Sequence, residues 1–447
     1  MTLKTEALKT PFTPPQLWLS ALKEHLRDPI HALISQGSGE RSRFSYICGQ
    51  SRSIVSLKRN FSDPNAVILT ALDQMQASKP AAIMGYISYP HNEKASNCSQ
   101  LPSIDIRSFD WQLVFDHHAQ RIQCQFSEKY ANSTELLKKI QQIASALANI
   151  SSTTTNKARP LKRFFIHDDF KPLVSKSDYQ AQFDAIQSHI LAGDIYQINL
   201  TLPFQTQYQG LPLHGFELLL EHVDTPYCAY YELESHTIMS FSPEEFIQTR
   251  GSKITTSPIK GTIARALDNV LLDQANKEKL KASTKDRAEH IMIVDLLRND
   301  LGKICESGTV AVNNLLNIES FSNVHHLVTQ VEGRLLPDIS PAKALLSCFP
   351  GGSITGAPKI KAMEIIHELE PFNREVYCGS IFHFNAQGDL SANIPIRTLV
   401  AEHQEQNPEQ GKITCWSGGG VVADSTWQSE YQEAVDKVNH LLSGLKR

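Results

Sequence analysis

Several patterns that would place the chain in a common class of protein are missing from its 447 residues. No run of about 18 apolar residues occurs, so we expect no membrane span. The first residues, Met1–Thr5, lead into no apolar signal-peptide core. The 8 cysteines are scattered and never form C-x-x-C, which argues against a zinc site and a secreted disulfide framework. We therefore expect a cytoplasmic protein.

The chain also lacks an excess of positive charge. Its net charge is −4 at pH 7, with 20% charged and 41% hydrophobic residues. This composition is typical of a soluble globular protein, and the length allows two or three cores. Without a basic surface we expect no nucleic-acid partner. An anionic small molecule would need a local group of positive side chains.

Strand-like and helix-like segments alternate along the chain, and several strand pairs are joined by hairpin-like turns. This pattern predicts an α+β fold with antiparallel sheets. Residues 150–161 are polar and aperiodic, which is typical of a linker. We therefore expect two regions, 1–150 and 162–447, without an internal repeat.

A lone lysine, Lys260, lies in the segment Ser257–Thr262. Pro258 fixes one backbone angle before it, and Gly261 allows another group to approach the backbone closely after it. The β-branched residues before this segment predict that Lys260 lies at the exit of a strand. A lysine that is partly desolvated becomes a nucleophile or a base. The alternative is an ordinary surface lysine beside a turn.

Two helices each carry a pair of carboxylates at a spacing of three residues, which brings both onto one helix face. The pairs are Asp286 with Glu289, and Glu430 with Glu433. The first helix, about 284–299, is apolar nearly all round and is predicted to be buried. The second, about 426–443, has Lys437 on the acidic face and Ala434, Val438, Leu441 and Leu442 toward the core. Together the pairs would suit Mg²⁺; each alone is also typical of a solvated helix face.

Two glycine-rich segments offer exposed backbone N–H groups. Gly418–Gly420 lies just upstream of the last helix and would hold a carboxylate, or form a plain strand and turn. The segment Pro350–Lys359 leads into a helix that starts near Pro358, and helix N-termini favour anions. Neither segment has the G-K-[ST] ending of a P-loop.

Arg397 and the pair His325-His326 lie in strand-like runs. Arg397 is a lone charge among apolar residues, so it must be paired or bind an anion. Adjacent residues of a strand face opposite sides, so one histidine can face a pocket while the other is structural.

Several of these segments resemble the chorismate-utilising enzymes. The motifs are Ala288-Glu289-His290, Arg298-Asn299-Asp300, Thr355–Lys359, the glycine-rich strand and Gln428–Glu433. The family includes anthranilate synthase component I, aminodeoxychorismate synthase component I, isochorismate synthase and salicylate synthase. The similarity is strong over about 177–440 and weaker in the N-terminal half. It implies two packed antiparallel sheets flanked by helices.

Within this family, Lys260 and Gln197 narrow the expected reaction. Anthranilate synthases have alanine at the position of Lys260, whereas aminodeoxychorismate synthases have a lysine that is the proposed covalent nucleophile. Members that add water have a lysine base at the position of Gln197, and a neutral amide cannot activate water. The resemblance therefore implies conversion of chorismate and ammonia to 4-amino-4-deoxychorismate, for p-aminobenzoate and folate synthesis. The alternatives are anthranilate synthase component I, an isochorismate synthase, and an inactive chorismate-binding regulatory relative.

The resemblance also implies roles for individual residues. Lys260 would be the nucleophile, Glu244 the general acid, and His326 the family's active-site histidine. Substrate-binding positions would be Gln197, Thr355, Arg397, Gly419, Gly420 and Lys437. Mg²⁺ would be held by Glu289 and Glu433, with support from Asp286 and Glu430, and would bind the ring carboxylate of chorismate.

One departure from the family and one missing motif complete the prediction. Relatives often have Gly-Tyr after Gly-Ser-Ile, with the tyrosine touching substrate, where this chain has Phe382-His383. The chain has no glutaminase-type cysteine motif, so ammonia is expected from a separate glutaminase (glutamine amidotransferase) subunit. Release of pyruvate would need a separate lyase.

Overall fold

The computed structural model describes residues 3–26, 28–37, 40–58, 63–91, 95, 100–130, 133–152, 164–321 and 324–446. Most of the expected linker, from 153 to 161, lies outside these residues, so the division at 150–161 stays a prediction. Within the described ranges, no helix has both the length and the apolar character needed to cross a membrane.

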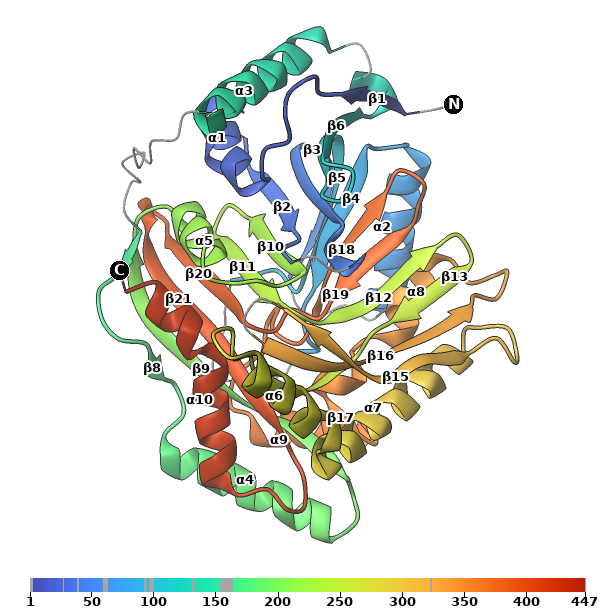
Figure 1. Cartoon of the computed structure of the whole chain (residues 1–447), viewed down its shortest axis with the longest axis vertical. Helices are drawn as coiled ribbons and strands as arrows, with labels where there is room; N and C mark the ends of the chain where they lie inside the picture. The colour runs from blue at the N-terminus through green and yellow to red at the C-terminus, as the bar shows by residue number, and fades with distance from the viewer. Residues whose placement is uncertain are drawn as a thin grey trace.

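Helices cover the outside of a large set of strands (Figure 1). They are α1 (Gln16–Leu26), α2 (Pro64–Ala77), α3 (Thr134–Ser152), α4 (Lys176–Leu191), α5 (Pro212–Leu220), α6 (Val270–Ala282), α7 (Thr284–Gly302), α8 (Pro341–Cys348), α9 (Lys359–Leu369) and α10 (Trp427–Gly444), with a 3-10 turn, η3, at Gly352–Ile354. Several start at a side-chain cap: Ser175, Asn269 and Ser283 each accept a backbone N–H from three residues further on.

The strands range from two-residue bridges to β21, which is 15 residues long. They are β1 (Lys4–Ala7), β2 (Ile30–Ile34), β3 (Phe44–Leu57), β4 (Ala82–Ile87), β5 (Ile104–Asp116), β6 (Arg121–Phe126), β7 (Phe165–Ile166), β8 (Lys171–Pro172), β9 (Gln197–Gln209), β10 (Tyr227–Glu232), β11 (His236–Ser242), β12 (Glu245–Arg250), β13 (Lys253–Thr256), β14 (Ile259–Ala264), β15 (Ala311–Ser320), β16 (Val324–Arg334), β17 (Gly356–Ala357), β18 (Ser380–Asn385), β19 (Leu390–Asn393), β20 (Thr398–Gln404) and β21 (Asn407–Val421).

The described strand pairs are antiparallel and form two arms that share β5. One arm runs β6-β5-β3-β2-β10-β11-β20-β21-β9. The other runs β5-β4-β18-β19-β12-β13-β16, and both β14 and β15 pair with β16. The predicted α+β class, with antiparallel sheets flanked by helices, is confirmed, and the shared strand joins the sheets into one hydrogen-bonded set.

Strands from the first 150 residues pair with strands of the second half at two places. Strand β2 pairs with β10, and β4 pairs with β18. One hydrophobic core contains buried residues from both halves, such as Trp18, Trp111, Phe216 and Phe241. The two halves are therefore packed as neighbours through backbone hydrogen bonds as well as side chains.

The last helix matches its predicted orientation, whereas α7 does not. Helix α10 lies along β21, with α4 beside it (Figure 1), and buries Ala434, Val438, Leu441 and Leu442 as its periodicity predicts. The prediction that the helix at 284–299 is buried is wrong. Ile291 of α7 is 42% exposed, because α7 covers β14 and β16 with one face and presents the other to solvent.

The sequence predicted that Lys260 lies at the exit of a strand, and this is wrong. Lys260 lies within a strand. Strand β13 ends at Thr256, and Lys260 is the second residue of β14. The pairing of β14 with β16 is interrupted between Lys260 and Thr262, where Gly261 has a φ of +74°. Gly261 tolerates this left-handed conformation. The bulge gives Lys260 a fixed position on the sheet.

Candidate active site

The side chain of Lys260 reaches a point between α7 and β21. Its Nζ atom lies 3.6 Å from Glu289 Oε2. On the other side, a Cβ atom at Gly420 would lie 3.4 Å from Lys260 Nζ and 2.3 Å from Gln197 Nε2. Gly420 therefore leaves the space that Gln197 occupies, and the two predicted residues Lys260 and Gln197 both lie beside the position that a side chain at Gly420 would fill.

The second acidic pair lies beside the neighbouring glycine. A Cβ atom at Gly419 would lie 2.9 Å from Glu430 Oε2 and 3.7 Å from both Glu433 Oε1 and Lys437 Nζ. Lys437 Nζ is 2.6 Å from Glu433 Oε1 and donates to the Gly418 carbonyl at 3.0 Å. Ser425 donates to Glu430 at 2.7 Å. The glycine run thus lets α10 place two carboxylates against the backbone of β21.

The glycine run is a strand and not a turn. Gly418, Gly419 and Gly420 pair with Thr201, Leu200 and Asn199 of β9. The pairing of β20 with β21 ends at Trp416, so the run extends past β20 on its other edge. Glu430 and Glu433 lie at the Cβ position of Gly419, and Lys260 lies at that of Gly420.

The four carboxylates predicted to hold a metal lie in two pairs on two helices. Asp286 of α7 is near Lys260, since a Cβ atom at Gly261 would lie 3.3 Å from Asp286 Cγ. Among the described residues, no three His, Cys, Asp or Glu side chains are grouped as metal ligands. The donor set is nevertheless suited to Mg²⁺, which takes a few carboxylate oxygens together with water and substrate oxygens. The space left by the missing side chain at Gly419 lies directly against these oxygens.

Glu244 is buried between β11 and β12. Ser353 donates to its Oε1 at 2.5 Å, and its backbone N–H donates to Ser242 Oγ at 3.1 Å. Burial raises the pKa of Glu244 above its ordinary value, and the Ser353 hydrogen bond and the charges of Lys260, Lys437 and Arg397 partly offset this. A carboxyl that keeps its proton more readily is suited to general acid chemistry.

Arg397 lies just before β20 with a φ of +52°. Burial lowers its pKa, and the charge of Glu244 opposes that effect. Within the described part of the chain, its guanidinium has no hydrogen-bonding or ion-pair partner in the protein. Its role as an anion-binding residue stays a prediction.

His326 is buried beside β14. Its Nδ1 atom is 2.8 Å from Thr262 Oγ1, and Phe321 packs edge-on against its ring at 5.4 Å. Burial lowers the pKa of His326 to about 3, so the ring is neutral at neutral pH.

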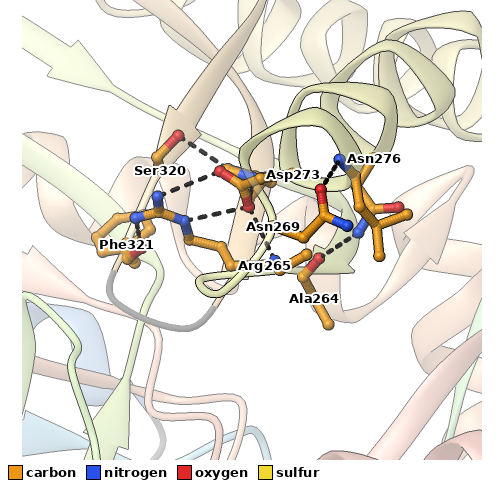
Figure 2. Close-up of polar contacts among 10 residues, drawn as sticks. Ala264, Arg265, Asn269, Asp273, Asn276, Ser320 and Phe321 are labelled. Carbon is orange, nitrogen blue, oxygen red and sulfur yellow. Dashed lines mark hydrogen bonds and ion pairs between the residues drawn. The ribbon is translucent and has the colours of Figure 1, made fainter.

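His325 faces the other way and anchors α6, as alternation along a strand requires. Its Nε2 atom is 2.9 Å from Asp273 Oδ1, and its Nδ1 atom is 2.8 Å from Ser320 Oγ. Figure 2 shows Asp273 also bound by Arg265, which in turn donates to the Phe321 carbonyl at 3.0 Å. Backbone and side-chain hydrogen bonds from Ala266 and Arg265 hold the pKa of Asp273 well below its ordinary value. This cluster is structural.

The sequence alone did not point to this cluster, because it joins two segments that are far apart in the chain: His325 and Asp273 are separated by 52 residues. The cluster also fixes the start of α6, where Asn276 donates to the Ala264 carbonyl at 2.9 Å (Figure 2). It thereby supports the segment that follows Lys260 along the chain.

The comparison with protein families agrees with this geometry. A family model described as chorismate binding enzyme matches residues 18–443. The chain belongs to the chorismate-binding enzymes. The resemblance seen in the motifs is therefore confirmed.

Similar chorismate-binding enzymes include proteins named aminodeoxychorismate synthase and proteins named anthranilate synthase. Aminodeoxychorismate synthase component 1 of Klebsiella aerogenes is 39% identical over 348 residues, covering 78% of this chain and 72% of the relative. Anthranilate synthase component 1 of Saccharomyces cerevisiae is 34% identical over 378 residues, covering 80% and 72%. The crystal structure of anthranilate synthase component I from Streptococcus pneumoniae TIGR4 has a TM-score of 0.73 at 25% identity and covers 91% of this chain and 93% of that one.

Two positions that the resemblance associates with substrate contact, Thr355 and His383, have side chains that are buried and bound to other parts of the protein. Thr355 is fully buried, and its hydroxyl donates to the carbonyls of Gly351 and Gly352 at 3.1 and 3.2 Å. His383, at the position of the family's tyrosine, is buried and stacked on Tyr46 with ring centroids 4.1 Å apart. Thr355 thus shapes the glycine turn, and His383 packs against the N-terminal strands.

A separate cavity lies beside Tyr227, whose side chain contacts Glu245, the neighbour of Glu244. It is lined by residues that include Arg41, Arg43, Tyr227 and Arg250. Tyr227 donates to Glu245 Oε2 at 2.7 Å. Tyr227 is therefore both a lining residue of this cavity and a hydrogen-bond partner of Glu245.

Proposed function

We propose that this chain is component 1 of an aminodeoxychorismate synthase and forms 4-amino-4-deoxychorismate from chorismate and ammonia. The observation that carries the proposal is the position of Lys260, whose amine lies between Glu289 and the bare backbone of Gly420. The name of the Klebsiella aerogenes relative supports the same reaction.

Lys260 and Glu244 would carry the two chemical steps. In the first step the free amine of Lys260 attacks C2 of chorismate, the ring double bond shifts, and the C4 hydroxyl leaves as water with a proton from Glu244. In the second step ammonia attacks C4, the double bond shifts back, and the bond between C2 and Lys260 breaks. The Lys260 nitrogen leaves as the neutral amine, and the one proton that the incoming ammonia loses returns to Glu244. The two steps then sum to chorismate and ammonia giving aminodeoxychorismate and water.

The positive side chains at the site would hold the substrate's carboxylates. Arg397 is suited to this role because its guanidinium has no protein partner in the described part of the chain. Lys437 is nearby on α10 and already contacts Glu433 at 2.6 Å. The backbone at Gly419 and Gly420 would contribute N–H groups. Gln197, a neutral amide, favours ammonia over water as the nucleophile.

Mg²⁺ would be held by Glu289 and Glu433, with Asp286 and Glu430 beside them. When bound, the ion would neutralise the ring carboxylate of chorismate. It would also relieve the repulsion among the four protein carboxylates.

Ammonia would be delivered by a separate glutaminase subunit. The name "component 1" of the Klebsiella aerogenes relative implies a second component. The product would then pass to a lyase that releases pyruvate and p-aminobenzoate.

The test is to incubate the purified chain with chorismate, Mg²⁺ and an ammonium salt at mildly alkaline pH, and to identify products by mass spectrometry and fluorescence. Aminodeoxychorismate, converted to p-aminobenzoate by added lyase, is the expected result. Anthranilate would assign the chain to the anthranilate synthases instead. Absence of turnover, even with a glutaminase subunit added, would favour an inactive regulatory relative.

A further inference from the structure

Ser353 contacts the proposed general acid from the glycine-rich turn. Its hydroxyl donates to Glu244 Oε1 at 2.5 Å. The two residues are 109 positions apart in the chain. The contact therefore exists only because η3 is folded against the start of β12.

The turn that carries Ser353 is held rigidly. The Thr355 hydroxyl donates to the Gly351 carbonyl at 3.1 Å, and Arg374 donates to the Ile354 carbonyl at 3.0 Å. A Cβ atom at Gly352 would lie 2.2 Å from Leu296 Cδ2, so the turn is packed directly on α7. The direction of the Ser353 hydroxyl is thus set by the fold.

Glu244 is fixed from its own side as well. Its N–H donates to Ser242 Oγ at 3.1 Å, and its carbonyl accepts from the Ile394 N–H at 3.1 Å. The charged and titratable groups that act on its carboxyl come from several elements. They are Lys260 of β14, Lys437 of α10, Arg397 before β20, and the buried thiol of Cys378.

We infer that Ser353 is a positioning residue that holds Oε1 of Glu244, leaves Oε2 to carry the transferred proton, and stabilises the carboxylate once the proton has gone. This inference rests on the proposed function, because it assigns the acid in that reaction a fixed orientation. A hydroxyl suits the role because it donates to Oε1 whether the carboxyl is protonated on Oε2 or ionised. The bond is stronger to the ionised carboxylate, so it favours release of the proton.

The expected effect of Ser353→Ala is a change in rate and in pH dependence together. Loss of the donor makes the carboxylate less stable, so the alkaline limb of the kcat profile moves to higher pH. Below that limb kcat falls about 10-fold, because the acid is weaker and less well aimed. KM for chorismate stays near its wild-type value, and Ser353→Thr, which keeps the hydroxyl, restores most of kcat.

A matched control is available at Ser127. This buried serine also donates to a carboxylate, Asp110 Oδ1, at 2.7 Å, but on the far side of the core at the end of β6. Ser127→Ala removes the same kind of bond and should leave the kcat profile unchanged. An alkaline limb at the same pH in Ser353→Ala and wild type would overturn the inference.

A second measurement separates this inference from the proposed function. The chain is labelled with glutamate enriched in ¹³C at the side-chain carboxyl, and Glu244 is assigned as the signal missing from Glu244→Gln. Its titration midpoint should rise in Ser353→Ala and not in Ser127→Ala. If the wild type makes no aminodeoxychorismate, the proposed function fails while this titration still decides the role of Ser353. An unchanged midpoint overturns it.

Discussion

Glu244 and Glu245 are adjacent in sequence and both buried, yet their surroundings differ. Glu244 accepts one hydrogen bond from Ser353 and lies among the charges of the Lys260 site. Glu245 accepts from Tyr227 at 2.7 Å and from Ser257 at 3.0 Å, and lies near Arg41. Burial raises the pKa of both carboxyls.

The difference shows that two adjacent glutamates at the start of β12 can have different roles. Glu244 is the proposed general acid, and Glu245 supports the structure. Glu244 lies just before β12 and Glu245 is its first residue, and the two carboxyls have different hydrogen-bond partners. Both oxygens of Glu245 are engaged by neighbouring hydroxyls, which fixes it as a support for the segment before Lys260. Glu244 has an oxygen left for substrate. Four predictions test this comparison, from the largest expected effect to the smallest.

The largest effect is expected from Lys260→Ala, which removes the proposed nucleophile from the site that contains Glu244. Formation of aminodeoxychorismate should fall by about 10⁴-fold or more, because the covalent step is lost. Lys253→Ala is the control, because Lys253 forms a comparable pair with Glu332 at 2.7 Å outside the site. Steady-state assays of both variants, with product identification by mass spectrometry, give the answer. Wild-type activity in Lys260→Ala would contradict the role of Lys260 as the nucleophile. New formation of anthranilate by this variant would show that residue 260 separates this reaction from that of the anthranilate synthases.

The two glutamates should respond differently to the same substitution. Glu244→Gln keeps the shape but cannot donate a carboxyl proton, so kcat should fall by about 10²- to 10⁴-fold. Glu245→Gln should keep most of the turnover but lose about 1–3 kcal/mol of unfolding free energy, because an amide nitrogen replaces one of the two oxygens that accept from Tyr227 and Ser257. Turnover and urea unfolding of both variants measure the contrast. Equal losses of turnover in the two variants would contradict the assignment of Glu244 to catalysis and Glu245 to structural support.

Arg397 and Arg41 extend the comparison of the two glutamates to the binding of chorismate. Arg397→Met should raise KM for chorismate about 10- to 100-fold, because a charge-assisted bond to a substrate carboxylate is lost. Arg41→Met, on the side of Glu245, removes the partner of Glu319 and should lower stability without raising KM. Substrate titrations and thermal unfolding of both variants test this. A KM change that is larger in Arg41→Met would contradict it.

The smallest effect concerns pH and stability. The pKa of Glu244 is raised in the folded chain, so its ionisation opposes folding. The loss of stability begins as pH rises through the ordinary value of 4.5 and is complete above the folded pKa. Glu244→Gln should therefore unfold at a higher urea concentration than wild type at neutral pH, and at an equal one below pH 4.5. A lower midpoint at neutral pH would show that the ionised carboxylate supports the fold.

Local patterns predicted much of the fold and of the site. Helix α10 buries the face that its 3.6-residue period indicated, because that period depends on neighbours along the same helix. Motifs such as Ala288-Glu289-His290 were sufficient to identify the family, and the paired carboxylates were visible from spacing alone. The structure then brought Lys260, Gln197, Glu430 and Glu433 to the same glycine run of β21.

Features that depend on distant contacts were decided by the tertiary structure. The exposure of α7 depends on what its other face meets, and composition does not reveal that. The strand position of Lys260 follows from pairing with β16, and the bond from Ser353 to Glu244 joins segments 109 residues apart. Sequence by itself determined which residues could do the chemistry. Long-range pairing decided which of them meet, because contacts between distant segments leave no local period in the chain.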